Sequence, residues 1–573
     1  MGIRNLEPFN QPMPVGVRLP EIEVEQRFYD ELGISNTSSN YDLLRELCLK
    51  GVKERGIDKL ENKQEYYDRV KMELSVLQEL GFVDYILLNW DILNFCHENH
   101  IPTGPGRGSA AGSLVLYLLK VTNIDPIQYD LFFERFVSRS RAKKTIVDDI
   151  TYLDGSLLAD VDNDISYNRR AEVIKYIEDK HKGKTCKILT LNTLSSKLCV
   201  KECGKIVGGY SEQKVNDISS LIPKQFGKVF KLDKAYDESE KLRQFCDDNP
   251  LVFKIARKLE GLNKNTGVHP SGIAISFYNI EQVMPMQKTN DGNYVSGYDM
   301  NDVASLMVKF DILGLRTLSV VHDTLKQLDM DIETIDVESN NIYENFKFIE
   351  APKGLFQIEA DTNFKAAKKI APRNLEELSA VVAIARPGAL DYLDTYTSYV
   401  KTSVFNSVHE FFDDILSYTG GIPLYQEQLM QMAVKVGFTL DEAEQLRRIV
   451  GKKKVDQMPA WKAKIEEKIS ENKLQKQIGD VLWKVAEDSA NYSFNKSHSI
   501  SYATLAAITT YLKFEHPQEF FLSLLKMAKH EPDSHNEISL INQELYQFNM
   551  KLLAPDLAKS ELDFSIEGRN IRY

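Results

Sequence analysis

The sequence predicts an α+β protein in which a sheet-containing domain is interrupted by a helical lobe and followed by a large helical domain. Three observations lead to this fold class. Runs rich in β-branched residues precede a stretch from about Thr190 to Leu262 that is helical in pattern, and strand-like sequence returns after it. From about Leu318 to the end, apolar residues recur at helical spacing and prolines interrupt the helices. The strand-like runs are KKTIVDDITYL, SLLADVDNDI, GIAISFY and LMVKFDILGL.

Length and composition are those of a multidomain globular protein. With roughly 150 residues to a domain, a chain of 573 residues is expected to hold about four domains. The net charge of −12 excludes a uniformly basic coat, so any contact with nucleic acid depends on local basic patches. No stretch approaches the roughly 20 uncharged apolar residues of a membrane span, and the start, MGIRNLEPFNQP, lacks the features of a signal peptide. We therefore expect a cytoplasmic protein without membrane contact.

Six cysteines are few for this length and follow no paired spacing, which is typical of a reducing compartment and argues against a disulfide framework. Cys199 and Cys203 share a helix face at i, i+4, and Cys96 lies close to His97 and His100. Neither group has the second pair of ligands that a zinc site needs, so zinc is not expected there.

The N-terminal part is expected to be helical. The first 60 residues hold a proline-punctuated leader and then an amphipathic helix in YDLLRELCLKGVKERG, and we expect them to form an adaptor segment. From Glu65 to His100 a long helical pattern runs into the glycine-rich segment GPGRGSAAG. Within that segment, Ser109 is expected to open a strongly apolar helix.

A β-hairpin is expected next along the chain. Asp154-Gly155 is a strong turn signal between KKTIVDDITYL and SLLADVDNDI. Carboxylates end the second of these segments, and the helix SYNRRAEVIKYIEDKH is expected to follow.

The carboxylates at the end of this hairpin are candidate metal ligands. Because side chains alternate across a strand, Asp160, Asp162 and Asp164 are expected on one face, where a pair of divalent cations would neutralise them. Asp311, in KFDIL, stands on another expected strand. Adding it gives an arrangement in which two magnesium ions bridge carboxylates and a substrate triphosphate.

Other interpretations of the aspartates remain. An isolated Asp-x-Asp pattern is more often a solvated or calcium-binding loop. An EF-hand loop counted from Asp160 would need glycine where Ile165 stands, and Glu172 lies one place beyond the required glutamate. Asp148 and Asp149 compete as ligands, but they are expected on the opposite arm of the hairpin and rank below the Asp160 group.

The segment from Gly104 to Gly112 is a candidate phosphate site. It supplies backbone amides free of Cβ obstruction before an expected helix, whose dipole favours phosphate. A simple helix-entry turn is the alternative. A P-loop is excluded because the Gly-Lys-Ser/Thr ending is missing, and no clear preceding strand or later acidic partner supports a dinucleotide fold.

A Gly-Ser before a helix, a strand with alternating aspartates and a third aspartate on a later strand follow the order seen in nucleotidyltransferases built like polymerase beta. From about Leu19 to Tyr573, the chain also resembles the bacterial replicative polymerases of family C, the DNA polymerase III alpha subunits. Nine motifs carry the resemblance in the expected order: GPGRGSAAGSLV, DLFFERFV, DVDND, VKFDILGLRTL, GLFQIE, IARPGAL, LYQEQLMQMA, LRRIVGKKK and FNKSHSISYA.

The resemblance implies a fold and a set of site residues. The fold is a polymerase-beta-like nucleotidyltransferase palm with a helical thumb and large, mostly helical fingers. Asp160, Asp162 and Asp311 are implied to be catalytic and to hold two Mg²⁺ ions, with Mn²⁺ as an alternative. The residues implied to bind the incoming nucleotide are Arg107, Gly108, Ser109, Arg135, Lys309, Arg447 and Arg448.

The implied domains are an N-terminal adaptor at 1–60, palm segments at 61–189 and 263–320, a thumb at 190–262, and fingers at 321–573. Within the thumb, a helix is expected to place lysines at four-residue steps on one face, where they would contact duplex phosphates. The alternative is a solvated face whose lysines balance Glu202. These DNA-binding candidates are Lys197, Lys201 and Lys205.

Three positions depart from the family pattern. Ala159 replaces the proline before the first aspartate, Ile165 replaces the aromatic residue after the third, and the stretch 136–160 is longer than usual. No ligand is removed, but the register of Asp160 against Asp164 stays open. Asp164 is expected to support the site or to cap the following helix.

The family usually has further modules on both sides of this region. We expect separate chains to supply clamp contact, C-terminal modules and any proofreading exonuclease, as in a split gene, a truncated form or a phage-encoded enzyme. Without those modules, weak DNA affinity and low processivity are expected.

The leading hypothesis is a DNA-templated DNA polymerase that adds deoxynucleoside monophosphates to a primer 3′-OH by a two-metal mechanism, without intrinsic proofreading. Its substrates would be primer-template DNA and deoxynucleoside triphosphates. Two alternatives are a non-catalytic subunit that binds primer-template and a template-independent nucleotidyltransferase.

Overall fold

The computed structural model describes residues 16–140, 143–225, 228–289, 292–454 and 456–573. Within these ranges, no helix is long and apolar enough to cross a membrane. The chain divides into two compact units. Unit 1 comprises the described residues up to Thr185 together with Ile275–Asn279 and Ala304–Tyr573, and unit 2 comprises Cys186–Ala274 and Ile280–Val303. Both contain helices and strands, so the predicted α+β class is confirmed.

Unit 1 begins with helices that the sequence largely predicted. The amphipathic helix of the adaptor segment is present as α2, but the long pattern from Glu65 to His100 forms two helices instead of one. Gly81 separates them, because its left-handed backbone ends α3. The bounds are α1 Gln26–Leu32, α2 Asn40–Glu54, α3 Lys63–Leu80 and α4 Val83–Glu98.

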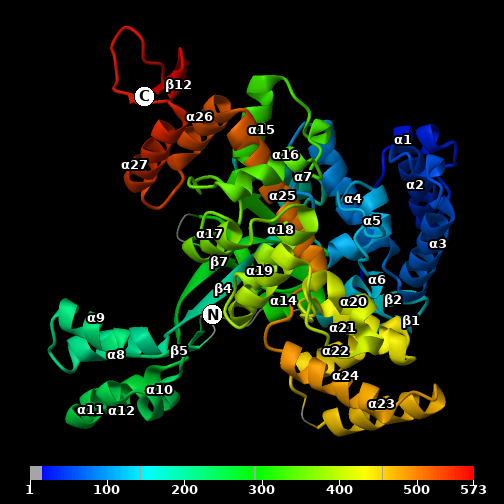
Figure 1. The fold of residues 1–573 in the computed structure, drawn as a ribbon, viewed down its shortest axis with the longest axis horizontal. Helices are drawn as coiled ribbons and strands as arrows, with labels where there is room; N and C mark the ends of the chain where they lie inside the picture. Colours follow the sequence, from blue (N-terminus) through cyan, green and yellow to red (C-terminus); the bar gives the residue numbers. More distant parts are fainter. Residues whose placement is uncertain (1–15, 141–142, 226–227, 290–291, 455) are drawn as a thin grey trace, which may run out of the picture. The chain divides into compact units, whose positions relative to one another are not determined.

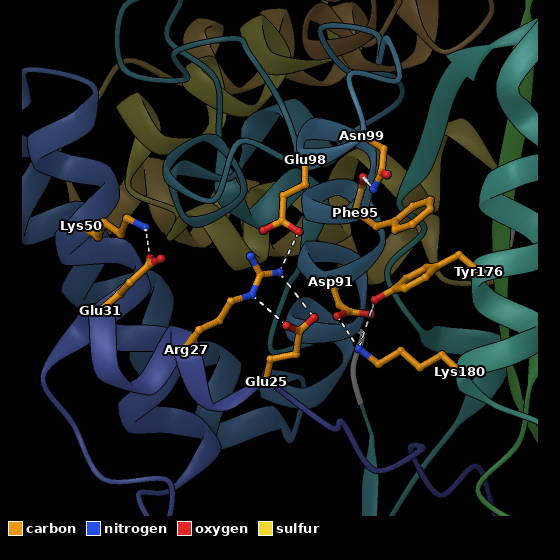
Figure 2. Close-up of polar contacts among 10 residues, drawn as sticks. All are labelled: Glu25, Arg27, Glu31, Lys50, Asp91, Phe95, Glu98, Asn99, Tyr176 and Lys180. Atoms are coloured by element: carbon orange, nitrogen blue, oxygen red, sulfur yellow. Dashed lines mark hydrogen bonds and ion pairs between the residues drawn. The ribbon is translucent and has the colours of Figure 1, made fainter.

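Charged side chains fasten the first helices to their neighbours (Figure 2). The guanidinium of Arg27, on α1, donates to the carboxylates of Glu25 and Glu98, and Glu98 ends α4. Lys180 donates to Asp91 of α4 at 2.5 Å and thereby links α4 to α7, Arg170–Lys180. These contacts hold the N-terminal helices against the part of the unit that follows β3, Asp162–Ser166.

The hairpin predicted between KKTIVDDITYL and SLLADVDNDI, with its turn at Asp154-Gly155, is wrong: a hairpin forms within the first segment alone, and β3 is not part of it. Strands β1, Lys144–Val147, and β2, Ile150–Leu153, pair in antiparallel fashion around Asp148 and Asp149, whose φ angles are 49° and 61°. A two-residue hairpin loop requires positive φ, and aspartate tolerates it better than most residues do. Gly155 instead begins a 3₁₀ turn, where a Cβ would collide with the carbonyl oxygen of Ala304. Asp148 and Asp149 therefore lie in the turn and not on a strand.

The centre of unit 1 is a parallel pair of strands. β3 pairs with β10, Val308–Leu315, in a register that places Asp162 opposite Asp311. The prediction of a strand in LMVKFDILGL is confirmed, and α15, Arg316–Leu328, follows β10 directly. The predicted helix after the aspartates is also confirmed, as a short 3₁₀ turn that leads into α7.

The helical lobe belongs to unit 2. Its helices pack around a core that includes the side chains of Cys199, Cys203 and Cys246. The helices of the lobe are α8 Ser196–Ile206, α9 Glu212–Ser220, α10 Leu232–Glu238, α11 Glu240–Asp248 and α12 Pro250–Leu259 (Figure 1). Unit 2 also contains the short helix α13, Ile280–Val283, which is not part of this core. The strands are β4 Thr185–Thr193, β5 Lys224–Gln225, β6 Lys228–Val229, β7 Asn263–Ile275, β8 Met286–Lys288 and β9 Tyr294–Asp299; β9 pairs parallel with β4 and antiparallel with β8.

The rest of unit 1 is mostly helical, as predicted after Leu318. One core forms around α18 and α25, and another around α21 to α24. The helices are α16 Asn340–Glu344, α17 Asp361–Ile370, α18 Leu375–Ile384, α19 Leu393–Thr402, α20 Asp413–Leu416, α21 Gln426–Val436, α22 Leu440–Gly451, α23 Met458–Glu471, α24 Lys476–Ser489, α25 Lys496–Glu515, α26 Pro517–Ala528 and α27 Ser534–Leu545 (Figure 1). Helix α14 spans Met300–Leu306, and three short strands near the C-terminus, β11 Leu552–Leu553, β12 Ser565–Glu567 and β13 Asn570–Arg572, were not predicted.

Candidate active site

Three aspartates come together at one end of the parallel strand pair. Asp162 is the first residue of β3, Asp311 is its register partner on β10, and Asp160 lies just before β3. One carboxylate oxygen of each lies within 4.8 Å of the others. Asp311 is buried, Asp162 is half-buried and Asp160 is exposed, so the trio opens toward solvent on one side. We call these three residues the aspartate trio.

The predicted alternation of three aspartates along one strand is wrong in detail. Asp160 precedes the strand, and Asp164 does not join the trio although it shares a strand face with Asp162. The side chain of Asp164 is 2% exposed and faces the guanidinium of Arg107 at 3.5 Å. Arg107 also lies 3.6 Å from Asp162, so one guanidinium faces both carboxylates; the supporting role of Asp164 stays a prediction.

The trio concentrates negative charge in a partly desolvated place. Burial and the neighbouring Asp160 carboxylate raise the pKa of Asp162 to about 6, although the charge of Arg107 acts in the opposite direction. Burial also raises the pKa of Asp164 to about 6. Lys309 forms an ion pair with Asp311. Hard divalent cations prefer oxygen ligands, and a bound cation would neutralise the repulsion among these carboxylates. The chemistry of the aspartate trio therefore fits such ions.

The glycine-rich segment lies beside the trio. A Cβ built on Gly108 would come 3.7 Å from Oδ2 of Asp162. The amide of Gly104 donates to the carbonyl oxygen of Asp164, which ties the segment to β3. Gly106 and Gly108 have φ angles of 142° and 63°, so other residues would strain the backbone there.

The helix after this segment starts later than predicted. Ser109 precedes a 3₁₀ turn, and α5, Leu114–Leu118, begins only after Ser113. The buried carboxylate of Glu73 accepts hydrogen bonds from the Ser113 hydroxyl and from the amides of Leu114 and Val115. The first amides of α5 are therefore already satisfied by a side chain, a contact that no local sequence pattern indicates. Donors for a phosphate must come from the segment around Gly108 and not from the helix.

A histidine from α25 completes the arrangement. The amide of Gly108 donates to Nδ1 of His498 at 3.1 Å, and the His498 ring lies 4.2 Å from the ring of Tyr502. Burial, together with the charges of Arg107 and Arg386, lowers the pKa of His498 to about 4, so the ring is a neutral acceptor. Sequence reasoning quoted the motif FNKSHSISYA but did not select this residue, which lies 390 positions from its partner.

Residues 42–314 match the model of the bacterial DNA polymerase III alpha NTPase domain, and residues 317–473 match that of the bacterial DNA polymerase III alpha subunit finger domain. The chain belongs to the DNA polymerase III alpha family. Together these matches cover the aspartate trio, the glycine-rich segment and α22.

Curated relatives support the assignment. The chain is 32% identical over 523 residues to a DNA polymerase III subunit alpha of Thermus aquaticus, a match that covers 88% of this chain and 41% of the relative. It is 31% identical over 547 residues to that of Bacillus subtilis and 30% identical over 580 residues to that of Pseudomonas aeruginosa. These two matches cover 93% and 96% of this chain but 47% and 48% of the relatives. The chain thus spans less than half of the length of these family members.

Two of the other basic residues that the family resemblance selected, Arg135 and Arg447, have partners of their own. The Arg135 guanidinium donates to Oε1 of Gln426 at 3.1 Å. Arg447, on α22, pairs with the buried carboxylate of Glu444 through two hydrogen bonds. Adjacent residues on a helix point in different directions, so Arg447 and Arg448 do not face one another.

The lysine series Lys197, Lys201 and Lys205 lies in unit 2. All three residues are on α8 and are partly exposed. The ammonium of Lys205 lies 3.4 Å from Glu202 and 3.0 Å from Glu212, so it is engaged in ion pairs. This contact agrees with the alternative of a charge-balanced face for Lys205, whereas no ion pair involves Lys197 or Lys201 within the described residues.

Proposed function

We propose that this chain is a DNA-templated DNA polymerase that transfers deoxynucleoside monophosphates to a primer 3′-OH. The observation that carries the proposal is the aspartate trio, which unites β3 and β10 in a chain of the DNA polymerase III alpha family. Two magnesium ions held by the trio, with manganese as a substitute, would activate the primer hydroxyl and neutralise charge on the triphosphate.

Each residue around the trio has a defined task in this proposal. Asp162 and Asp311 hold their carboxylates in register across paired strands, which fixes their separation before any ion binds. Arg107 orients Asp162 and Asp164 and presents a cation next to the place for phosphate oxygens. His498 keeps the Gly108 amide and its neighbours in a fixed position, so the segment with Ser109 can bind the triphosphate.

The domain roles belong to the same proposal. We assign a polymerase-beta-like palm to 61–189 and 263–320, a thumb to 190–262 and fingers to 321–573. Primer-template DNA and deoxynucleoside triphosphates are the proposed substrates, and the proposed location is the cytoplasm of a bacterium or of a phage-infected host. Clamp contact, C-terminal modules and proofreading are proposed to come from separate chains.

Extension of a labelled hairpin primer, with magnesium and one nucleotide at a time, tests this proposal. A templated polymerase adds only the nucleotide complementary to the template base. A template-independent transferase adds all four nucleotides, and a non-catalytic subunit adds none while still binding the hairpin. Either of the last two results would replace the proposal by the corresponding alternative.

A further inference from the structure

One cavity of unit 1 lies away from the aspartate trio. It has a volume of about 430 Å³ and is lined by α15, α26 and the residues around the end of β3. Ser166 ends β3 and Asp162 begins it, so the cavity is at the opposite end of this strand from the trio, at roughly 13 Å along the backbone. Helices α15 and α26 pack against one another beside it (Figure 1). We call it the α15–α26 cavity.

Buried hydroxyl groups form the inner wall of the α15–α26 cavity. The hydroxyls of Ser166 and Ser319 lie 2.8 Å apart, and the amide of Asn168 donates to Ser319. Ser523, on α26, donates to Oδ2 of Asp323 at 2.9 Å, so this carboxylate is hydrogen-bonded within the wall. Hydroxyl groups can redirect their protons toward an entering anion.

The charged side chains that line this cavity are net cationic, because four basic residues face the two carboxylates of Asp323 and Asp563. Lys326 and Lys526 face it from the two helices, and neither has an ion pair within the part of the chain that the structure describes. Lys529 and Arg169 also line it, but they are paired with Asp563 and Glu172. The rim therefore keeps two ammonium groups without a counter-ion of their own.

Two further observations show that the positive potential is local. Burial, and next the charges of Lys326 and Arg169, lowers the pKa of His322, which lines the same cavity. By contrast, the larger cavity on the other side of α26, of about 1070 Å³, is lined by more acidic than basic side chains, among them Glu350, Glu537 and Glu544. An anion would thus enter the α15–α26 cavity and avoid its neighbour.

We propose that the α15–α26 cavity is a second, non-catalytic site for phosphate groups. Two free ammonium groups above a wall of hydroxyls are the recognition chemistry of phosphate, and the volume is within the range of small-ligand sites. The phosphates belong either to a free nucleotide or to the backbone of a nucleic-acid strand, because the donors are the same for both. This proposal is independent of the activity proposed for the trio.

The test is a binding measurement on the full chain in EDTA. Sodium tripolyphosphate, titrated calorimetrically, represents the free nucleotide, and a fluorescent twelve-residue oligo(dT), followed by anisotropy, represents the strand. The double variant Lys326→Gln, Lys526→Gln should weaken one of these interactions by about tenfold or more, since hydrogen bonds to charged groups contribute on that scale. Lys59→Gln with Lys71→Gln, two exposed lysines of unit 1 away from this cavity, is the matched control and should change neither.

Each result bears on the site. Loss of tripolyphosphate binding identifies a free-nucleotide site, and loss restricted to oligo(dT) identifies a strand site. The variant Lys326→Arg, Lys526→Arg keeps both charges and should restore most of the affinity, which guards against a folding defect. If tripolyphosphate and oligo(dT) bind the glutamine variant as tightly as the parent chain, the proposal is overturned. The binding assay is performed in EDTA and does not depend on catalysis. A chain that fails to extend a primer can therefore still pass or fail this test of the α15–α26 cavity.

Discussion

Asp162→Asn should stabilise the metal-free chain at neutral pH. The ordinary pKa of an aspartate, 3.8, is raised to about 6 at Asp162 by burial and by the Asp160 carboxylate. The folded state holds this proton more tightly than the unfolded state does. Protonation of Asp162 therefore contributes its full stabilisation of the folded chain below about pH 3.8, and this stabilisation is lost as the pH rises through about 6. At pH 7.5 the charged side chain therefore opposes folding, and asparagine removes that opposition.

The magnitude follows from the same values. An elevation from 3.8 to about 6 corresponds to about 3 kcal/mol, at about 1.4 kcal/mol per tenfold change. Since 24% of the side chain is exposed, screening by solvent reduces this to roughly 1–2 kcal/mol. The gain should fall by about half at pH 5, where part of the opposing charge is already neutralised in the folded chain.

Urea unfolding in EDTA, followed by tryptophan fluorescence, measures the effect through the transition midpoint. Asp179→Asn, at an exposed position of α7, is the control and should leave the midpoint unchanged. Added magnesium should stabilise the parent chain and not the Asp162→Asn variant. A lower midpoint for Asp162→Asn at pH 7.5, or a gain of equal size at pH 5, would refute the electrostatic reasoning.

Three further predictions concern contacts around the proposed site. His498→Leu removes the acceptor of the Gly108 amide and should raise the nucleotide KM several-fold more than His498→Asn, which keeps an acceptor. Equal nucleotide KM values for the two variants would rule out this positioning role. Glu73→Ala leaves the buried amides of Leu114 and Val115 without an acceptor and removes the ion-pair partner of Arg69, so it should lower the free energy of unfolding by about 3–5 kcal/mol. Glu73→Gln keeps an acceptor and should lower it less in the same urea assay. Replacing Lys197, Lys201 and Lys205 by glutamine should reduce the slope of log affinity for primer-template against log salt concentration by roughly two to three units, and nearer two because Lys205 is already paired. An unchanged slope would show that the duplex binds another surface.

The parts of the fold that the sequence predicted are those governed by local pattern. Strands around Asp162 and Asp311 were predicted because β-branched residues and alternating side chains identify them. The hairpin turn was placed wrongly because Asp154-Gly155 is the stronger local signal, while the actual turn depends on positive φ at two aspartates. Gly155 is needed instead for close approach to another segment, which no local pattern reveals.

The residues of the candidate site also separate into those that the local sequence pattern predicts and those that depend on distant contacts. The members of the aspartate trio were selected from spacing and motif order, and the structure brings them together. Glu73 and His498 were missed because each acts through a partner far along the chain, 41 and 390 positions away for Leu114 and Gly108. Such contacts are set by tertiary packing, and neither residue type is diagnostic on its own.

The most direct test of the central claim is single-turnover incorporation by Asp311→Asn and Asp162→Asn, with DNA binding measured in parallel by anisotropy. If the trio carries the chemistry, each variant should lose about a thousandfold or more in the rate of complementary nucleotide addition, since the metal ions supply several kcal/mol to the transition state. Primer-template affinity should change little, because in this account the aspartates would hold the metal ions and would not contact the DNA backbone. Near-normal incorporation by either purified variant would contradict the assignment of the aspartate trio as the catalytic centre.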